Sequence, residues 1–211
     1  MPARLRVAAI VPAYNEAANI IPVLLTLMAH PGLSEVLVVD DGSVDETAAV
    51  ARGTGARVIR LEQNVGKGGA MCEGARHTDA EILLYIDADL VGLSPEHIDL
   101  LLAPLLDEGA DMSVGLFDEG RAATDLAQRL APFLSGQRAL HRRVIEGAPG
   151  LAETRYGVEV ALEKYARQAQ LRVSKVRLCH VAQVMKEQKR GVVKGFAARV
   201  KMYWEILRAA R

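Results

Sequence analysis

The sequence predicts an α/β fold in which a mostly parallel sheet is covered by helices on both faces. Short apolar runs alternate with helix-like segments along the first 120 residues, which is typical of right-handed strand–helix–strand units. These runs are continuously apolar, as expected for strands buried on both faces. With 211 residues, half of them hydrophobic, we expect one domain spanning 1–211.

The elements are expected in a regular order. The strands predicted from apolar runs are Arg6–Val11, Glu35–Asp40, Arg57–Leu61, Ile82–Ile86, Met112–Leu116 and Leu171–Leu178. Asn15 is expected to cap the first helix, and Ser43 with Glu46 to form a capping box for the second. The remaining helices are expected to begin near 64 and at Ser94, and to span Val160–Gln168.

Charge is divided unevenly between the two halves of the chain. Residues 1–120 carry 7 basic and 19 acidic residues, net −12, whereas 121–211 carry 19 and 7, net +12. An acidic half suits a cation, and a basic half suits an anionic small molecule or a lipid phosphate. Complementary packing of the two halves is the alternative. We expect no nucleic-acid partner.

The cysteine content and hydropathy favour a cytoplasmic protein. Cys72 and Cys179 lie in different predicted elements, so free thiols in a reducing compartment are expected. The sequence shows no signal-peptide pattern and no apolar run long enough to span a bilayer. A basic C-terminal segment places Phe196, Val200, Tyr203 and Leu207 on one helical face. It is expected to dock on its own domain, to form a homodimer, or to contact the inner face of a membrane.

The motif Asp87-Ala88-Asp89 directly follows the central apolar run. If extended backbone continues through it, both carboxylates leave the same face of the strand. Two such carboxylates repel each other unless a cation lies between them, and hard divalent cations prefer oxygen ligands. We therefore expect a metal–diphosphate site here. A strand-ending turn with solvated aspartates is the alternative.

Other polar loops are expected to meet this motif, because the carboxyl ends of parallel strands share one edge of a sheet. These loops are Pro12-Ala13-Tyr14, Asp40-Asp41 and Gly66-Lys67. The glycines near Lys67 would let backbone amides approach a phosphate at a helix N-terminus. A plain glycine-rich helix start is the alternative for that stretch.

The second half offers candidates for the acceptor side. Glu159 begins a helix, where it is either a catalytic carboxylate or a charge that complements the helix dipole. His180 ends a predicted strand, as the aspartates do, which favours a place at the same site. Arg138, Arg142 and Arg143 are expected to hold a phosphate on the acceptor.

Taken together, these motifs resemble the family 2 nucleotide-sugar glycosyltransferases, which have the Rossmann-type fold called GT-A. The matching stretches are 11–16, 39–47, 64–68 and 87–89, in the expected order. The resemblance implies that the donor nucleotide is bound by Pro12, Ala13, Tyr14, Glu16, Asp40, Asp41, Gly66, Lys67, Asp87, Ala88 and Asp89. It also implies that Asp89 and Asp87 bind Mn²⁺ or Mg²⁺, with Asp87 counted among the catalytic residues.

The second half is similar to the glucosyl-3-phosphoglycerate synthases. That similarity implies an acceptor site formed by Gly136, Gln137, Arg138, Tyr156, Gly157 and Glu159. It further implies that Glu159 is catalytic and that His180 completes the metal shell. The Glu-Asp pair that supplies the base in many family 2 enzymes is missing from the sequence, which leaves the retaining or inverting outcome open.

The expected activity is therefore metal-dependent transfer of a hexose from a nucleotide diphosphate sugar, UDP-glucose in the first instance. The 1–120 half would bind donor and metal, and the 121–211 half the acceptor. The alternatives are a sugar nucleotidyltransferase and a nucleotide-binding scaffold without catalysis. The nucleotidyltransferases' glycine- and basic-rich opening motif is missing near the first strand.

Overall fold

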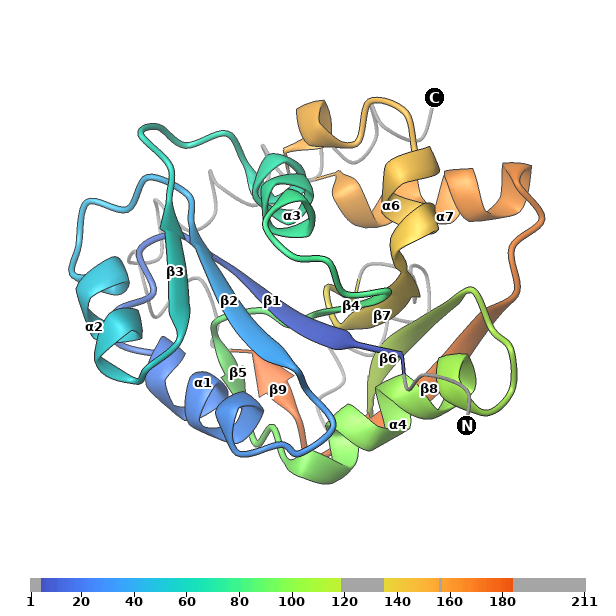
Figure 1. The fold of residues 1–211 in the computed structure, drawn as a ribbon, viewed down its shortest axis with the longest axis horizontal. Helices are drawn as coiled ribbons and strands as arrows, with labels where there is room; N and C mark the ends of the chain where they lie inside the picture. The colour runs from blue at the N-terminus through green and yellow to red at the C-terminus, as the bar shows by residue number, and fades with distance from the viewer. Residues whose placement is uncertain (1–4, 119–134, 156, 184–211) are drawn as a thin grey trace.

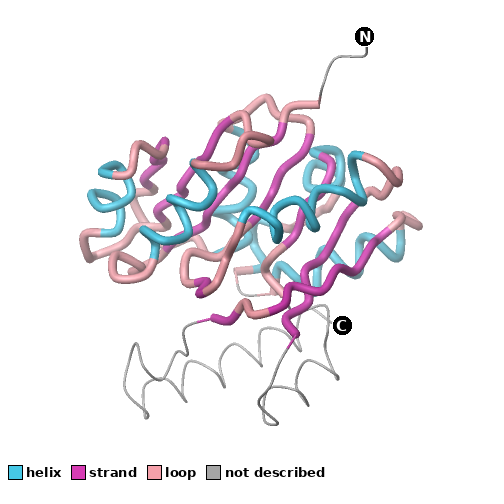
Figure 2. The backbone as a smooth tube through the Cα atoms, turned by 90° about the horizontal axis from the view of Figure 1, so that it is seen from below, coloured by secondary structure: helices cyan, strands magenta, loops and turns pink. Residues whose placement is uncertain are grey.

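A computed structural model describes residues 5–118, 135–155 and 157–183 of the chain. Its main feature is a seven-stranded sheet with the order β3-β2-β1-β4-β7-β6-β8. Figures 1 and 2 show this sheet from two directions. All neighbouring strands are parallel except β7, which is antiparallel to β4 and β6. The strands are β1 (Val7–Ala13), β2 (Glu35–Asp40), β3 (Arg57–Arg60), β4 (Ile82–Tyr85), β6 (Met112–Asp118), β7 (Arg138–His141) and β8 (Val173–Cys179). The predicted mostly parallel sheet is confirmed.

Helices cover both faces of this sheet, because alternate strand residues bury apolar side chains on opposite sides. Ala9 and Val11 of β1 join the core beneath α1, α2 and α4, whereas Ala8 and Ile10 join the core beneath α3, α6 and α7. The helices are α1 (Ile20–Met28), α2 (Thr47–Gly53), α3 (Lys67–Arg76), α4 (Pro95–Leu106), α6 (Arg142–Gly147) and α7 (Val158–Gln168), with a 3₁₀ turn η2 (Ala152–Thr154).

A separate two-stranded ribbon connects distant parts of the chain. Strand β5 (Leu90–Val91) directly follows the Asp-x-Asp motif and pairs antiparallel with β9 (Ala182–Gln183). In the register, Leu90 lies opposite Gln183 and Val91 opposite Ala182. This ribbon brings a segment from the second half of the chain to the carboxyl end of β4.

Several local predictions were wrong. Strand β7 was not expected, because its four residues, Arg138–His141, run into a basic stretch that hides their apolar pattern. Helix α1 begins at Ile20 after Asn19, so Asn15 does not cap it. Helix α2 begins after Glu46 without a side-chain cap, so the Ser43–Glu46 capping box is absent from it. Ala88 and Asp89 lie in a turn rather than in extended backbone.

Some expectations fall outside the described residues, namely Tyr156 and the basic C-terminal segment with its predicted amphipathic helix. Among the helices that the structure describes, none combines the length and apolar character that crossing a bilayer requires.

Candidate active site

The polar loops of the first half meet at the carboxyl edge of the parallel strands. Ala13, at the end of β1, lies opposite Asp40 at the end of β2. The Asp41 backbone N–H donates to the Ala13 carbonyl at 2.8 Å. The Asp41 carboxylate accepts hydrogen bonds from the N–H groups of Val65 (2.7 Å) and Gly66 (2.9 Å). The three loops therefore form one connected unit, as the fold class predicts.

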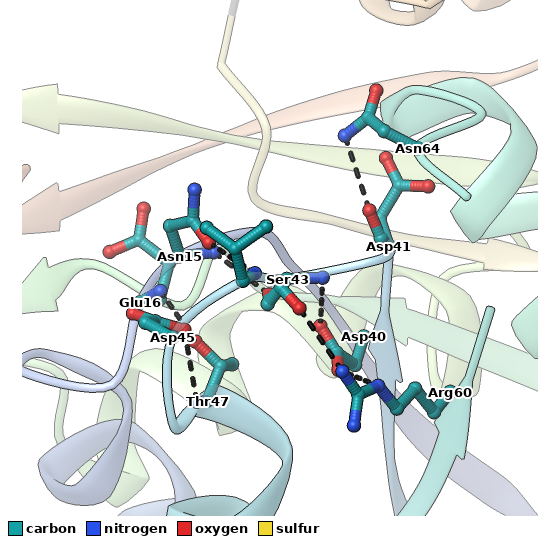
Figure 3. A network of polar contacts seen from close by, with 10 residues as sticks. Asn15, Glu16, Asp40, Asp41, Ser43, Asp45, Thr47, Arg60 and Asn64 are labelled. Carbon is teal, nitrogen blue, oxygen red and sulfur yellow. Dashed lines mark hydrogen bonds and ion pairs between the residues drawn. The ribbon is translucent and has the colours of Figure 1, made fainter. Parts of the chain in front are cut away.

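A network of polar contacts fastens the loop after β1 to the loop after β2 (Figure 3). The Asn15 backbone N–H donates to Ser43 Oγ at 2.9 Å, and Asn15 Oδ1 accepts from the Val44 N–H at 2.9 Å. The Glu16 N–H donates to Thr47 Oγ1 at 2.8 Å. Residues predicted as helix caps thus join two loops instead, which fixes the backbone from which Tyr14 and Glu16 project.

Asp40 and Asp41 shape these loops through their carboxylates. Asp40 is fully buried, with Oδ1 accepting from the Ser43 N–H at 3.0 Å and Oδ2 lying 3.5 Å from Arg60 Nε. Burial raises the pKa of Asp41, against the opposing effect of its hydrogen bonds to Val65 and Gly66. Both Asp41 oxygens accept hydrogen bonds from backbone N–H groups of the chain itself. Contact between this side chain and a nucleotide remains a prediction.

Gly66 sets the direction in which α3 begins. Its φ of +91° favours glycine, and a Cβ at this position would lie 2.7 Å from the Cα of Arg155. The Gly68 N–H donates to the Arg155 carbonyl at 3.1 Å. The start of α3 is thereby held against η2, and Lys67 is the first residue of the helix.

Lys67 forms the centre of the site. Its Nζ lies 2.6 Å from Asp87 Oδ1 and 2.7 Å from Glu159 Oε1. The three side chains are 22%, 14% and 10% exposed, respectively. Burial would lower the pKa of Lys67, but the charges and hydrogen bonds of Asp87 and Glu159 outweigh it and raise that pKa. Lys67 therefore stays an ammonium ion at any physiological pH.

The second oxygen of Asp87 is bound by two amides. Gln137 Nε2 donates to Asp87 Oδ2 at 3.2 Å, and Gln183 Nε2 donates to the same oxygen at 2.5 Å. Gly136 lies so close that a Cβ there would be 2.3 Å from both Asp87 Oδ2 and Lys67 Nζ. Predicted acceptor residues 136 and 137 thus lie directly against the Asp-x-Asp motif. No sequence pattern marks Gln183 as a site residue, because only the β5–β9 register brings it here.

The predicted metal ligands are only partly gathered. Asp87 and Asp89 are partly buried after β4, with Ala88 buried between them. His180 is exposed in a left-handed conformation, φ +61°, with its carbonyl against Gly92. Within the described ranges, no three His, Cys, Asp or Glu side chains cluster as a ready-made metal site. Coordination by His180 stays a prediction.

Arg138 and Gly157 lie behind this cluster. Arg138, at the start of β7, is 1% exposed and donates to the Ser135 carbonyl. Burial lowers the pKa of Arg138, while the charges of Glu159 and Asp87 oppose that effect. Gly157 precedes α7 and places Glu159 in its first turn. An acceptor contact by Arg138 or Gly157 stays a prediction.

The prediction that Arg142 and Arg143 hold an acceptor phosphate was wrong. The Arg142 guanidinium donates to the carbonyls of Ala75 (2.7 Å), Ala80 (2.9 Å) and Thr78. Arg143 pairs with Asp111. Both arginines follow the carboxyl end of an antiparallel strand, so they lie at the opposite edge of the sheet from Asp87.

Two cavities, of about 280 and 200 Å³, also lie at that opposite edge, and His30 lines both. The His30 ring is already committed, because Nδ1 accepts from the Gly32 N–H and Nε2 bonds to Asp99 Oδ1 at 3.1 Å. Neither cavity approaches the Lys67 cluster.

Comparison with known proteins agrees with this geometry. The model of glycosyl transferase family 2 matches residues 8–165, more than half of the chain. The chain belongs to glycosyl transferase family 2. Its mostly parallel sheet accordingly has the GT-A arrangement predicted for this family.

Among curated family 2 relatives, the glucosyl-3-phosphoglycerate synthase of Mycobacterium tuberculosis (strain H37Rv) is 30% identical over 196 residues. That match covers 74% of this chain and 59% of the relative, so the chain spans less than two thirds of it. An undecaprenyl-phosphate 4-deoxy-4-formamido-L-arabinose transferase from Enterobacter sp. (strain 638) is 30% identical over 162 residues, covering 72% of this chain and 46% of the relative.

Crystal structures of the M. tuberculosis synthase are also similar. The complex with Mn²⁺, UDP-glucose and phosphoglyceric acid has a TM-score of 0.75 at 27% identity, covering 98% of this chain and 80% of that chain. The complex with Mg²⁺ and UDP has a TM-score of 0.69 at 28% identity, covering 92% and 79%.

Proposed function

We propose that this family 2 chain transfers a hexose from a nucleotide diphosphate sugar, UDP-glucose in the first instance, to a phosphorylated acceptor. The observation that carries the proposal is the contact of one ammonium group, that of Lys67, with both Asp87 and Glu159. Asp87 belongs to the predicted donor motif and Glu159 to the predicted acceptor side. The contact supports a single reaction centre built from both halves of the chain.

The residues present fit a divalent cation. Asp87 and Asp89 supply carboxylate oxygens, which Mn²⁺ and Mg²⁺ favour, and a bound diphosphate could fill further positions of the shell. We infer that Asp89 is the principal ligand, with Asp87 close by, as the resemblance to family 2 enzymes implies. When bound, the ion would stabilise the negative charge on the leaving diphosphate.

The chain's own residues then have distinct roles. A donor diphosphate competes with the two carboxylates for the Lys67 ammonium. As Lys67 turns toward phosphate, Glu159 loses its counter-ion and becomes free to accept a hydrogen bond from an acceptor hydroxyl. Arg138, buried behind the cluster, keeps one positive charge near Asp87 and Glu159 throughout. Donor binding therefore prepares the acceptor side.

The acceptor class is inferred as an anion. The net +12 charge of residues 121–211 supports it, as do the relatives named for 3-phosphoglycerate and for undecaprenyl phosphate. A soluble phosphorylated acid is the first candidate, and a lipid phosphate is the second. The names of the relatives support each of these two acceptor classes, so both acceptors are tested in the same assay.

The test is a thermal-shift panel followed by a transfer assay. A ligand at 100 times its Kd stabilises the native state by about 2.7 kcal/mol, which is readily measured. We expect UDP-glucose with Mn²⁺ to raise the melting temperature more than either component alone. Transfer from UDP-[¹⁴C]glucose is then measured to 3-phosphoglycerate and to undecaprenyl phosphate. A melting temperature that no nucleotide sugar shifts, with or without Mn²⁺, would contradict the proposal.

A further inference from the structure

Gln183 reaches the Asp-x-Asp motif from a part of the chain to which neither the motif nor the proposed mechanism assigns a role. Its backbone pairs with Leu90, and its side-chain Nε2 donates to Asp87 Oδ2 at 2.5 Å. The two residues are 96 positions apart in the sequence. Gln183 is exposed, so packing in the core does not explain why its side chain lies against Asp87.

The contact completes the hydrogen bonding of Asp87. Lys67 binds Oδ1, while Gln137 and Gln183 donate to Oδ2. Removing Gln183 would leave Oδ2 with Gln137 at 3.2 Å, the longer of the two contacts. An amide carries no charge, so Gln183 affects the direction of the carboxylate rather than the net charge of the site.

The backbone around Gln183 is fixed by contacts of its own. His97 Nε2, at the start of α4, lies 2.9 Å from the carbonyl oxygen of Cys179. Gly92 packs so closely that a Cβ there would be 2.3 Å from the His180 carbonyl oxygen. The segment that leads into β9 is therefore held by α4 and by the residue after β5, and it presents the Gln183 amide to Asp87 from a defined position.

We propose that Gln183 is a positioning residue for Asp87, through which the β5–β9 ribbon sets the orientation of the donor and metal site. This inference rests on the proposed function, because it concerns the same donor and metal. A carboxylate held by three donors from α3, the residue before β7, and β9 cannot rotate freely. Its free oxygen lone pairs then face one direction, which preorganises the site for the diphosphate and its cation.

Two substitutions separate positioning from simple loss of contact. Gln183→Ala removes the donor, and we expect Mn²⁺-dependent UDP binding to weaken about tenfold with little change in melting temperature. Gln183→Met keeps the length of the side chain but has no N–H group that could donate to Asp87. Its Mn²⁺-dependent UDP binding should therefore weaken as far as that of Gln183→Ala does.

Calorimetric titration of UDP in the presence of Mn²⁺ provides the measurement, and the exposed Gln168 at the end of α7 provides a matched control, Gln168→Ala. The control should bind as wild type does. Equal affinity for wild type and Gln183→Ala, or wild-type affinity in Gln183→Met, would overturn the inference. Failure of wild type itself to bind UDP would instead overturn the proposed function, so the two failures are distinct.

Discussion

Lys67 and Glu159, which lie 92 positions apart in the sequence, are joined by an ion pair of 2.7 Å. The same ammonium contacts Asp87 at 2.6 Å, so one cation is shared by a carboxylate from each half of the chain. Breaking such a partly buried arrangement by removing one charge leaves the others uncompensated. Because the pair joins residues from both halves of the chain, the cluster is complete only in the folded protein.

Glu159→Gln tests the catalytic role of this carboxylate. Shape and most hydrogen bonding survive the change while the charge is lost, so we expect donor binding within about threefold of wild type and transfer reduced at least 100-fold. Transfer kinetics with separate KM and kcat values measure this. Glu163→Gln, one turn further along α7 and paired with Arg167, is the matched control and should keep near-normal turnover. Normal turnover in Glu159→Gln would show that Glu159 only complements the dipole of α7 and has no catalytic role.

Gly136→Ala tests the closeness of the 136–137 segment to the centre. The new Cβ would lie 2.3 Å from Asp87 Oδ2 and from Lys67 Nζ, so these side-chain ends must move apart while the backbone stays. We expect loss of transfer with a melting temperature close to that of wild type. Gly53→Ala in α2 is the control, because its Cβ would meet nothing within 4 Å. Full activity in Gly136→Ala would show that the Lys67–Asp87 contact is dispensable.

Arg142→Ala distinguishes a structural arginine from an acceptor-binding one. The guanidinium satisfies carbonyls of Ala75, Thr78 and Ala80 at and after the end of α3, so its loss should reduce the free energy of unfolding by about 2–4 kcal/mol. Arg143→Ala, which breaks an exposed pair, should cost about 0–1 kcal/mol. Urea unfolding measures both. A raised acceptor KM in either variant would restore the phosphate-binding role that the structure contradicts.

The lowered pKa of His141 predicts that the folded protein loses stability as the pH falls. Burial, and then the charge of Arg143, lower the pKa of His141 below its ordinary 6.5, although Asp111 opposes this. The unfolded chain therefore takes up this proton at higher pH than the folded chain. The contribution to stability is present above about pH 6.5 and is lost as the pH falls toward the lower, folded-state pKa. His141→Gln should lose less stability than wild type between pH 7.5 and 5.5 in urea unfolding. Equal losses would contradict the assignment.

Much of the first half was predictable from the sequence, because buried parallel strands have continuous apolar runs and their carboxyl ends share an edge. Strand Glu35–Asp40 has the predicted bounds, and the Asp41, Lys67 and Asp87 loops meet as expected. The predictions of helix caps at Asn15 and Ser43 were wrong for a physical reason. Asn15 and Ser43 have side chains suited to capping, but they bond to each other's loops, a choice that depends on tertiary neighbours.

The second half was harder to predict, because its contacts depend on antiparallel register. Arg142 and Asp87 are both polar residues after a strand, yet β7 runs opposite to β4, which puts Arg142 at the far edge. Gln183 has no motif or periodicity that marks it, and only the pairing of β9 with β5 carries it to Asp87.

The proposed donor site depends on a metal ion held by Asp89. Calorimetric titration of UDP-glucose into wild type and Asp89→Asn, each with and without Mn²⁺, tests this dependence. We expect wild type to bind at least tenfold more tightly with Mn²⁺, and Asp89→Asn to keep its melting temperature but lose the Mn²⁺ effect. Unchanged Mn²⁺-dependent binding in a folded Asp89→Asn protein would contradict it.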